Sequence, residues 1–149
     1  HWNYSRFVMK MADYTGGLAV FRGFHPASFG DTYYAYIRPD KNGDMAELRE
    51  KQSFTEKRHE EFASTGVYYV SEWRYFIHYA KELLKNGLPV GNEYYASLIY
   101  NLMIADEKRV GIFEVEKFIC WGTPEDLEQY LFWSSYFKND IYRISGRLV

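Results

Sequence analysis

The strongest structural signal in the chain is the segment Phe62–Val70, which reads Phe-Ala-Ser-Thr-Gly-Val-Tyr-Tyr-Val. Its second half is β-branched and aromatic and has no charge, which predicts a strand at the centre of an α/β sheet, covered on both faces. Gly66 lies in the middle of this strand. Glycine weakens a strand and is kept mostly at a bulge or where a ligand approaches the backbone closely, and both alternatives are open here.

The length, charge and cysteine content of the chain limit the classes of protein to which it can belong. The 149 residues are enough for a single domain, 1–149, with one core. The net charge is −2 and there is no basic run, so a nucleic-acid partner is not expected. No apolar run approaches the roughly 20 residues that cross a bilayer, so we expect no membrane partner. The single cysteine, Cys120, fits a reducing compartment, and we expect a cytoplasmic protein.

The N-terminal half predicts one helix and a hairpin. Apolar residues at near-helical spacing predict a helix over 4–12, which Gly16-Gly17 ends before a short buried strand, Leu18–Phe21. The segments Thr32–Arg38 and Met45–Lys51 flank Asn42-Gly43, a strong hairpin turn signal. The first residue is His1 and not Met, so we expect that the chain is part of something longer.

The C-terminal half predicts helices with one strand between them. Ser71 is a good N-cap for a helix whose apolar residues recur at helical spacing until Asn86-Gly87. A second helix is expected from Asn92 or Glu93 to about Ile104, then a strand over Arg109–Glu116. Thr123, with proline and two acids after it, predicts a third helix to about Phe137, followed by a short tail.

Four motifs, in order along the chain, resemble those of the sugar-1-phosphate nucleotidyltransferases, or NDP-sugar pyrophosphorylases. Each is weak alone, but four in order are fairly specific, and together they cover about residues 18–136. The branch that the chain resembles most is that of the bacterial capsule and surface-polysaccharide enzymes. The motifs are Glu50-Lys51, Ala63-Ser64-Thr65-Gly66-Val67-Tyr68-Tyr69, Gly91-Asn92-Glu93-Tyr94-Tyr95 and Phe118-Ile119-Cys120-Trp121-Gly122-Thr123-Pro124.

The resemblance implies a fold and a reaction. The fold would be α/β, a Rossmann-like glycosyltransferase-A type mixed sheet with flanking helices, with its N-terminal strands missing from this chain. The reaction would join an NTP and a sugar 1-phosphate into an NDP-sugar and pyrophosphate, with Mg²⁺. In such a displacement at phosphorus the protein mainly positions the reactants and neutralises charge.

The resemblance also implies substrate-binding residues. Glu50 would accept hydrogen bonds from sugar hydroxyls, and Lys51 would hold the sugar phosphate. Glu93 would bind another hydroxyl, while Gly30 and Gly66 would approach the sugar through the backbone. Trp121 is a further pocket residue by the same comparison. No catalytic residue is assigned.

Two departures from the family pattern concern the nucleotide and the metal. The Gly-x-Gly-Thr-Arg loop that binds the nucleotide is not in the sequence, and we expect it, with the first metal-binding Asp, in a preceding part. Cys120 stands where many members have a metal-binding Asp, and a thiol is a poor Mg²⁺ ligand. Asp126, a group outside the chain or a differently built site remain as alternatives, so we name no metal ligand. The histidines His25, His59 and His78 also lack metal-ligand spacing.

Simpler interpretations stay open for each residue. Glu50-Lys51 is also what the solvated end of a hairpin looks like, and Glu93 at a helix start would favour the helix dipole without any ligand. Trp121 also suits a core position. At the level of the whole chain, the alternatives are a non-catalytic sugar-phosphate binding module and a ligand-free fragment that oligomerises. An unpaired sheet edge would favour association, so we expect a homo-oligomer.

Overall fold

The computed structural model describes the backbone of residues 2–23, 34–87 and 89–145, and the side chains up to residue 138. The chain divides into two compact units, His1–Lys117 and Phe118–Val149. Each unit is described by itself below. Gly30, one of the predicted site residues, lies outside the described residues.

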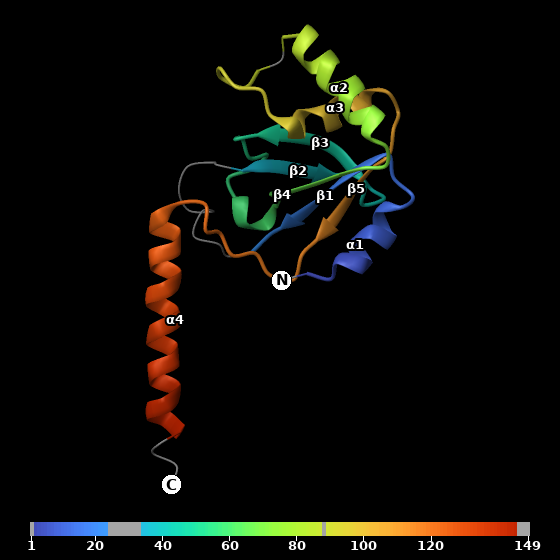
Figure 1. Cartoon of the computed structure of the whole chain (residues 1–149). Helices are drawn as coiled ribbons and strands as arrows, with labels where there is room; N and C mark the ends of the chain where they lie inside the picture. Colours follow the sequence, from blue (N-terminus) through green and yellow to red (C-terminus); the bar gives the residue numbers. More distant parts are fainter. Residues whose placement is uncertain (1, 24–33, 88, 146–149) are drawn as a thin grey trace. The chain divides into compact units, whose positions relative to one another are not determined.

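The first unit is built on a five-stranded mixed sheet with the strand order β3-β2-β4-β1-β5 (Figure 1). β4 pairs antiparallel with both of its neighbours, and β1 pairs parallel with β5. The prediction that Phe62–Val70 is the central strand is therefore confirmed. The strands are β1 (Gly16–Phe21), β2 (Ala35–Pro39), β3 (Met45–Glu50), β4 (Phe62–Val70) and β5 (Val110–Glu114).

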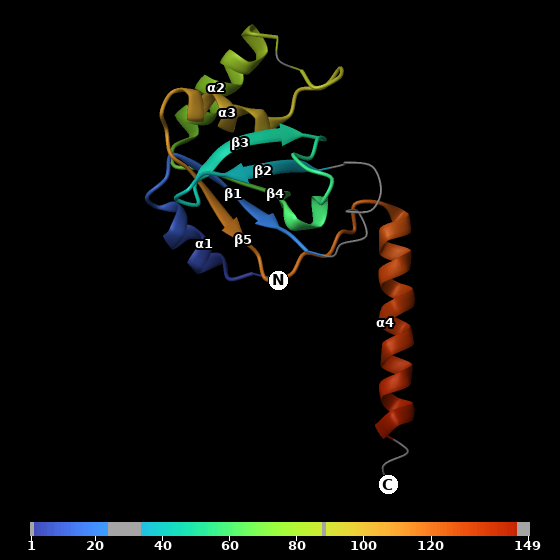
Figure 2. The ribbon, with the colours of Figure 1, turned by 180° about the vertical axis from the view of Figure 1, so that it is seen from behind.

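Helices cover both faces of this sheet (Figures 1 and 2). Residues of α2 (Trp73–Lys85) and α3 (Ile99–Ala105) share the main core with Leu18 and Val20. α1 (Tyr4–Met11) packs in a smaller cluster with Ala19, which lies between them in β1. Because successive strand residues point to opposite faces, the two clusters lie on opposite sides of the sheet.

The predicted hairpin is present, and its turn explains why. Gly43 has a φ of +85°, and its N–H donates to the carbonyl of Asp40 at 3.1 Å. The Asp40 carboxylate also accepts from the N–H groups of Asn42 and Asp44, so one acidic side chain organises the turn. β2 and β3 then pair antiparallel from Pro39 and Met45 onward.

The expectation that Gly16 and Gly17 end the first helix is wrong, because α1 already ends at Met11 and the two glycines are the first residues of β1. A Cβ atom on Gly17 would lie 2.2 Å from the Sδ of Met11, and one on Gly111 would lie 2.9 Å from its Cε. A Cβ atom at either glycine would therefore force the Met11 side chain to shift, and one on Gly111 would also displace the Tyr14 ring, which lies 2.9 Å away. The role of Gly16 and Gly17 as strand residues was not expected from the sequence.

Two expectations about α2 are wrong. Ser71 is not the N-cap, since the helix begins after Glu72, whose side chain makes no capping hydrogen bond. The helix buries Tyr79 and Leu83 and leaves the tryptophan of the expected apolar stripe, Trp73, 72% exposed. The predicted end is confirmed, because Gly87 has a φ of +57°, which ends the helix in the left-handed conformation.

The segment before α3 also differs from its prediction. No helix opens at Asn92 or Glu93; instead, a 3-10 helix, η3 (Ala96–Leu98), leads directly into α3. Glu93 lies in a turn in which its N–H and carbonyl both bond to Val90. The glutamate is therefore not a partner for a helix dipole, and the alternative explanation for its presence falls away.

The second half of β4 is less covered than its composition suggested. Val67 and Tyr68 are 38% and 45% exposed, so the expectation of a strand covered on both faces is wrong there. The ladder with β1 shifts register between Leu18 and Val20, which places the irregularity opposite Gly66. The bulge alternative for Gly66 is thus confirmed.

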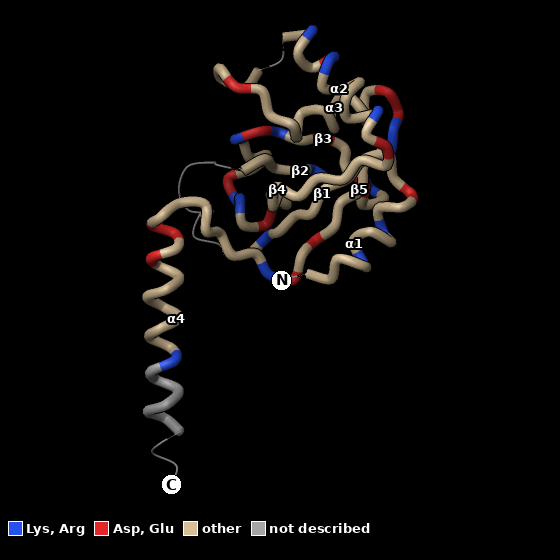
Figure 3. The backbone as a smooth tube through the Cα atoms, in the orientation of Figure 1, with Lys and Arg blue, Asp and Glu red and all other residues tan. Residues whose placement is uncertain are grey.

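The second unit consists of a short segment and one long helix, α4 (Pro124–Ser145). Thr123 caps it as predicted, because its Oγ1 accepts from the N–H of Asp126 at 3.2 Å. The helix continues eight residues beyond the predicted end at Phe137, into the predicted tail. Figure 3 shows acids at its start and a long uncharged middle. Even so, none of the helices described here is both long and apolar enough to span a membrane.

Candidate functional site

Glu50 is the last residue of the edge strand β3, and its carboxylate is half buried. The hydroxyl of Ser97 donates to its Oε2 at 2.5 Å. Ser97 is fully buried in η3, so the bond draws the glutamate toward the helical segment that covers this end of the sheet. A hairpin end in open solvent would not have such a partner.

Burial is the largest influence on the charge of this carboxyl. It raises the pKa of Glu50 above its ordinary value, while the Ser97 hydrogen bond and the Lys51 ammonium act in the opposite direction. The fold therefore opposes the ionised form that would accept hydrogen bonds from a ligand. A carboxyl kept under such conditions is more typical of a functional site than of a surface.

Lys51 follows directly and turns its side chain toward a distant segment. Its φ is +55°, and its N–H donates to the carbonyl of Tyr34 at 3.0 Å, which fixes this left-handed turn. The ammonium lies 3.3 Å from Oε2 of Glu93 and 4.8 Å from the ring centre of Tyr95. Tyr95 also donates its hydroxyl to Glu93. The motif Glu50-Lys51 and the motif around Glu93 therefore meet in space.

The Lys51–Glu93 pair is charged and open to solvent. Hydrogen bonds from the Tyr95 hydroxyl and then from Lys51 lower the pKa of Glu93. Hydrogen bonds with Tyr95 and then with Glu93 raise the pKa of Lys51. Both side chains are substantially exposed, at 44% for Lys51 and 65% for Glu93. Exposed pairs contribute little to stability, so a ligand could replace either partner at small cost.

Tyr68 of β4 extends the same group of residues toward the centre of the sheet. Its hydroxyl interacts with the side chains of Ser64 and Ser97; burial, the largest effect, and the nearby Glu50 charge raise its pKa. Ser64 also accepts from the N–H of Gly66 at 3.1 Å. Ser64 and Ser97 are the buried polar side chains of the described core. We use the name polar corner for these residues: Glu50, Lys51, Ser64, Tyr68, Glu93, Tyr95 and Ser97.

The polar corner contains residues that the sequence did not identify as site residues. Ser97 was missed, and Ser64, Tyr68 and Tyr95 were quoted only within a motif. A serine flanked by Ala96, Leu98 and Ile99 was the available signal, because a hydroxyl in an apolar run needs a buried partner.

Gly66 lies beside this corner in an open position. Its φ is +82°, and no atom lies within 4 Å of where a Cβ would be. Glycine is therefore required by the backbone conformation and not by packing. The Gly66 N–H is bonded to Ser64, and the open space lies where the Cβ would be, two residues from Tyr68 on the same strand.

Trp121 belongs to the second unit, where its side chain is 57% exposed and its ring lies 5.1 Å from that of Tyr130. Cys120 Sγ lies 3.5 Å from Oδ2 of Asp126. The thiol at the position of the family's metal-binding Asp therefore lies beside Asp126, the carboxylate that was considered as its substitute. Trp121 is not a core residue within its unit.

The described residues do not form a Mg²⁺ site at the polar corner. Among them, the group of His, Cys, Asp or Glu side chains close enough to share an ion is His78, Glu82 and Asp106, which includes neither Glu50 nor Glu93. The carboxylates of Glu50 and Glu93 are instead engaged by Ser97 and by Lys51 and Tyr95. We therefore assign no step to a metal ion at this corner.

Compared with known proteins, the sequence matches no family model and no curated protein. Among solved structures, the fold is similar to the nucleoside-diphosphate-sugar pyrophosphorylase from Vibrio cholerae RC9, with a TM-score of 0.63 and 19% identity, over 79% of this chain and 46% of that one. A CMP:2-keto-3-deoxy-manno-octonic acid synthetase complexed with CTP gives a TM-score of 0.49 and 14% identity, over 89% and 54%.

The chain thus spans about half the length of each of these structures. The similarity to the pyrophosphorylase concerns the fold: a mixed α/β sheet with flanking helices. The fold expected from the family resemblance is therefore confirmed.

Proposed function

We propose that this chain is the sugar-phosphate-binding part of a nucleotidyltransferase that makes an NDP-sugar and pyrophosphate from an NTP and a sugar 1-phosphate. The substrates are thus an NTP and a sugar 1-phosphate, and the setting is the cytoplasm. By the resemblance, the product would serve surface polysaccharide synthesis. The proposal is also supported by the similar fold of a protein named as a nucleoside-diphosphate-sugar pyrophosphorylase.

One observation carries the proposal: Glu50, Lys51 and Glu93 come together at the polar corner. They were selected as the sugar and phosphate contacts from motifs that lie about 40 residues apart, and Lys51 Nζ is 3.3 Å from Glu93 Oε2. Two carboxylates beside one ammonium offer acceptors for hydroxyl groups and a cation for a phosphate. A sugar phosphate presents both groups on one small molecule.

The corner also explains how such a ligand would bind without disturbing the core. The phosphate would take Lys51 from Glu93, and sugar hydroxyls would then replace the lost hydrogen bond on the glutamate. Glu50, held by Ser97, would keep its position and accept from a further hydroxyl. Gly66 leaves space beside Tyr68 where the sugar ring could lie against the backbone.

Mg²⁺ remains part of the proposal for the complete reaction, in line with the family. The described residues supply no site for it near Glu50, so its ligands would have to come from other groups. The second candidate function, a non-catalytic sugar-phosphate module, rests on the same corner and differs only in whether transfer occurs.

The direct test is binding of sugar 1-phosphates by isothermal titration calorimetry, with inorganic phosphate and free sugar as separate ligands. We expect at least one hexose 1-phosphate to bind more tightly than either separate ligand. Glu50→Ala and Lys51→Ala should each weaken binding by about 10- to 150-fold, because a hydrogen bond to a charged group contributes roughly 1.5–3 kcal/mol.

Lys57→Ala is the matched control, since Lys57 is an exposed lysine that pairs with Glu60 at 3.4 Å, as Lys51 pairs with Glu93. The Lys57→Ala variant should bind the hexose 1-phosphate with the same affinity as the wild type. Unchanged affinity in both Glu50→Ala and Lys51→Ala would remove the sugar-phosphate site from this corner. Pyrophosphate release with an NTP then separates an enzyme from a binding module.

A further inference from the structure

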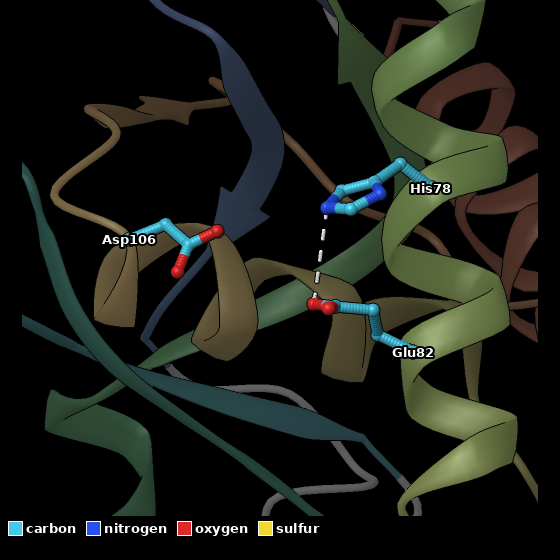
Figure 4. Close-up of side chains that lie close together, drawn as sticks. All are labelled: His78, Glu82 and Asp106. Carbon is cyan, nitrogen blue, oxygen red and sulfur yellow. Dashed lines mark ion pairs between the residues drawn. The ribbon is translucent and has the colours of Figure 1, made fainter.

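We propose that His78, Glu82 and Asp106 form a Zn²⁺ site that joins α2 to the end of α3. One ligand atom from each residue lies within 4.8 Å of the other two. Figure 4 shows the imidazole and the Glu82 carboxylate on one side and the Asp106 carboxylate turned toward them from the other. The three residues belong to no motif of the proposed function and share no member with the polar corner.

The first two ligands are placed by helical spacing. His78 and Glu82 are four residues apart in α2, so both project from one face of the helix. His78 Nε2 lies 3.9 Å from Glu82 Oε2. An imidazole and a carboxylate one turn apart can approach a common ion by small rotations of exposed side chains.

The third ligand is fixed by a buried residue. Asp106 follows α3 as its C-cap residue, and the hydroxyl of Tyr79 donates to its Oδ2 at 3.0 Å. Tyr79 is only 2% exposed, so its position is set by the core. Carboxylates that bind metals are commonly oriented by such hydrogen bonds from a second residue. The other oxygen of Asp106 remains for an ion.

Charge gives an independent reason to expect a cation here. Within residues 34–87 and 89–138, neither Glu82 nor Asp106 makes an ion pair with a lysine or an arginine, and the ion pair of Glu82 is with His78. A Zn²⁺ ion binds the neutral form of an imidazole, so the charged ligands of the site would be the two neighbouring carboxylates. A divalent ion would balance both of them.

The ligand types select Zn²⁺ over Mg²⁺. Zn²⁺ accepts imidazole nitrogen and carboxylate oxygen in tetrahedral sites at about 2.0–2.2 Å, whereas Mg²⁺ prefers six oxygens. Three protein ligands leave a fourth position for water, which suits the exposed location. Since α2 and α3 contribute separately, the ion would bind the folded chain and stabilise it.

Calorimetric titration of the metal-free chain with ZnCl₂ tests the site. We expect one Zn²⁺ per chain, no comparable heat with MgCl₂, and a Tm that rises with ZnCl₂ and returns with EDTA. His78→Ala and Asp106→Asn should each weaken Zn²⁺ binding by at least about 10-fold, and Tyr79→Phe by about 10-fold or more, as expected for loss of a supporting hydrogen bond.

His59→Ala is the matched control, because His59 is also exposed and lies 3.8 Å from a glutamate, Glu60. It should bind Zn²⁺ like the wild type. Equal affinity in the wild type and His78→Ala would overturn the proposal, as would a loss in His59→Ala of the same size. The Tm values of His78→Ala and Asp106→Asn in EDTA, expected to match the wild type, exclude unfolding as the cause of weaker binding in these two variants.

Discussion

The side-chain amide of Asn101 on α3 pairs with both backbone groups of Leu48 on the edge strand β3. Its Oδ1 accepts from the Leu48 N–H at 2.9 Å, and its Nδ2 donates to the Leu48 carbonyl at 2.7 Å. β3 has no strand on its outer side within the described sheet. One side chain thus takes the place that a residue of a neighbouring strand would occupy.

Removing this amide should destabilise the fold. Asn101→Ala leaves the N–H and carbonyl of a buried residue without partners, and we expect a loss of about 1–3 kcal/mol in the free energy of unfolding. Urea denaturation measures it. Asn92→Ala, at an exposed asparagine in the preceding loop, should change stability by less than about 0.5 kcal/mol. Equal losses in the two variants would contradict the role of the amide.

Glu50 should make stability depend on pH. Its raised pKa means that the folded state holds the proton more tightly than the unfolded state. Its stabilising effect is therefore fully present below the unfolded pKa and is lost as pH rises through the folded pKa. Glu50→Gln keeps an acceptor for Ser97 without the charge, so it should be more stable than the wild type at pH 7.

The effect of Glu50 is isolated by subtracting the unfolding free energy of the wild type from that of Glu50→Gln at each pH from 3 to 8. We expect this difference in unfolding free energy to shrink toward zero below the ordinary pKa of a glutamate. Glu56→Gln, at an exposed carboxyl, supplies the background. A Glu50→Gln advantage that is the same at every pH would show that the charge is not responsible.

Gly66 should tolerate no ordinary residue without strain. Gly66→Ala adds no clash, since nothing lies within 4 Å, but it forces an L-residue to a φ of +82°. We expect a loss of roughly 1–2 kcal/mol in unfolding free energy, and a smaller loss for Gly66→Asn because asparagine visits this region more readily. A thermal or urea midpoint for Gly66→Ala equal to that of the wild type would contradict the strain.

Association is the remaining prediction. The middle of α4 carries aromatic and aliphatic side chains that are more than half exposed, namely Leu131, Phe132, Trp133 and Phe137. Such surfaces are normally covered, so we expect a dimer or larger species at about tens of micromolar. Light scattering after gel filtration measures it, with Trp133→Ser shifting the mass toward the monomer and Glu128→Ala as control. A wild-type monomer at every concentration would refute the expectation.

The sequence predicted correctly those features that depend on one or two neighbouring residues. The Asn42-Gly43 turn, the bulge at Gly66 and the Thr123 cap are all present, because turn, bulge and cap geometry depend on one or two residues. The sequence also placed Glu50, Lys51 and Glu93 together through the resemblance, and the structure brings them together. Their roles toward a ligand stay predictions.

The failures have a common physical origin in packing. α2 has apolar residues on more than one face, so spacing alone could not show that Tyr79 and Leu83, and not Trp73, face the sheet. Ser97 was missed because its partner, Glu50, is distant in sequence. Glu93 was placed at a helix start because the polar residues Asn92 and Glu93 resemble a cap, whereas the helix begins only after η3.

The contact of Met11 with Gly17 and Gly111 has a consequence for how this protein can change over evolution. The three positions share one small volume between α1 and the sheet. A methyl group gained on either strand would meet the Met11 side chain, and one on Gly111 would also meet the Tyr14 ring at 2.9 Å, so these side chains would have to move or become smaller. Substitutions here should therefore be inherited as compensated sets, so that among relatives an alanine at 17 or 111 accompanies a shorter side chain at 11.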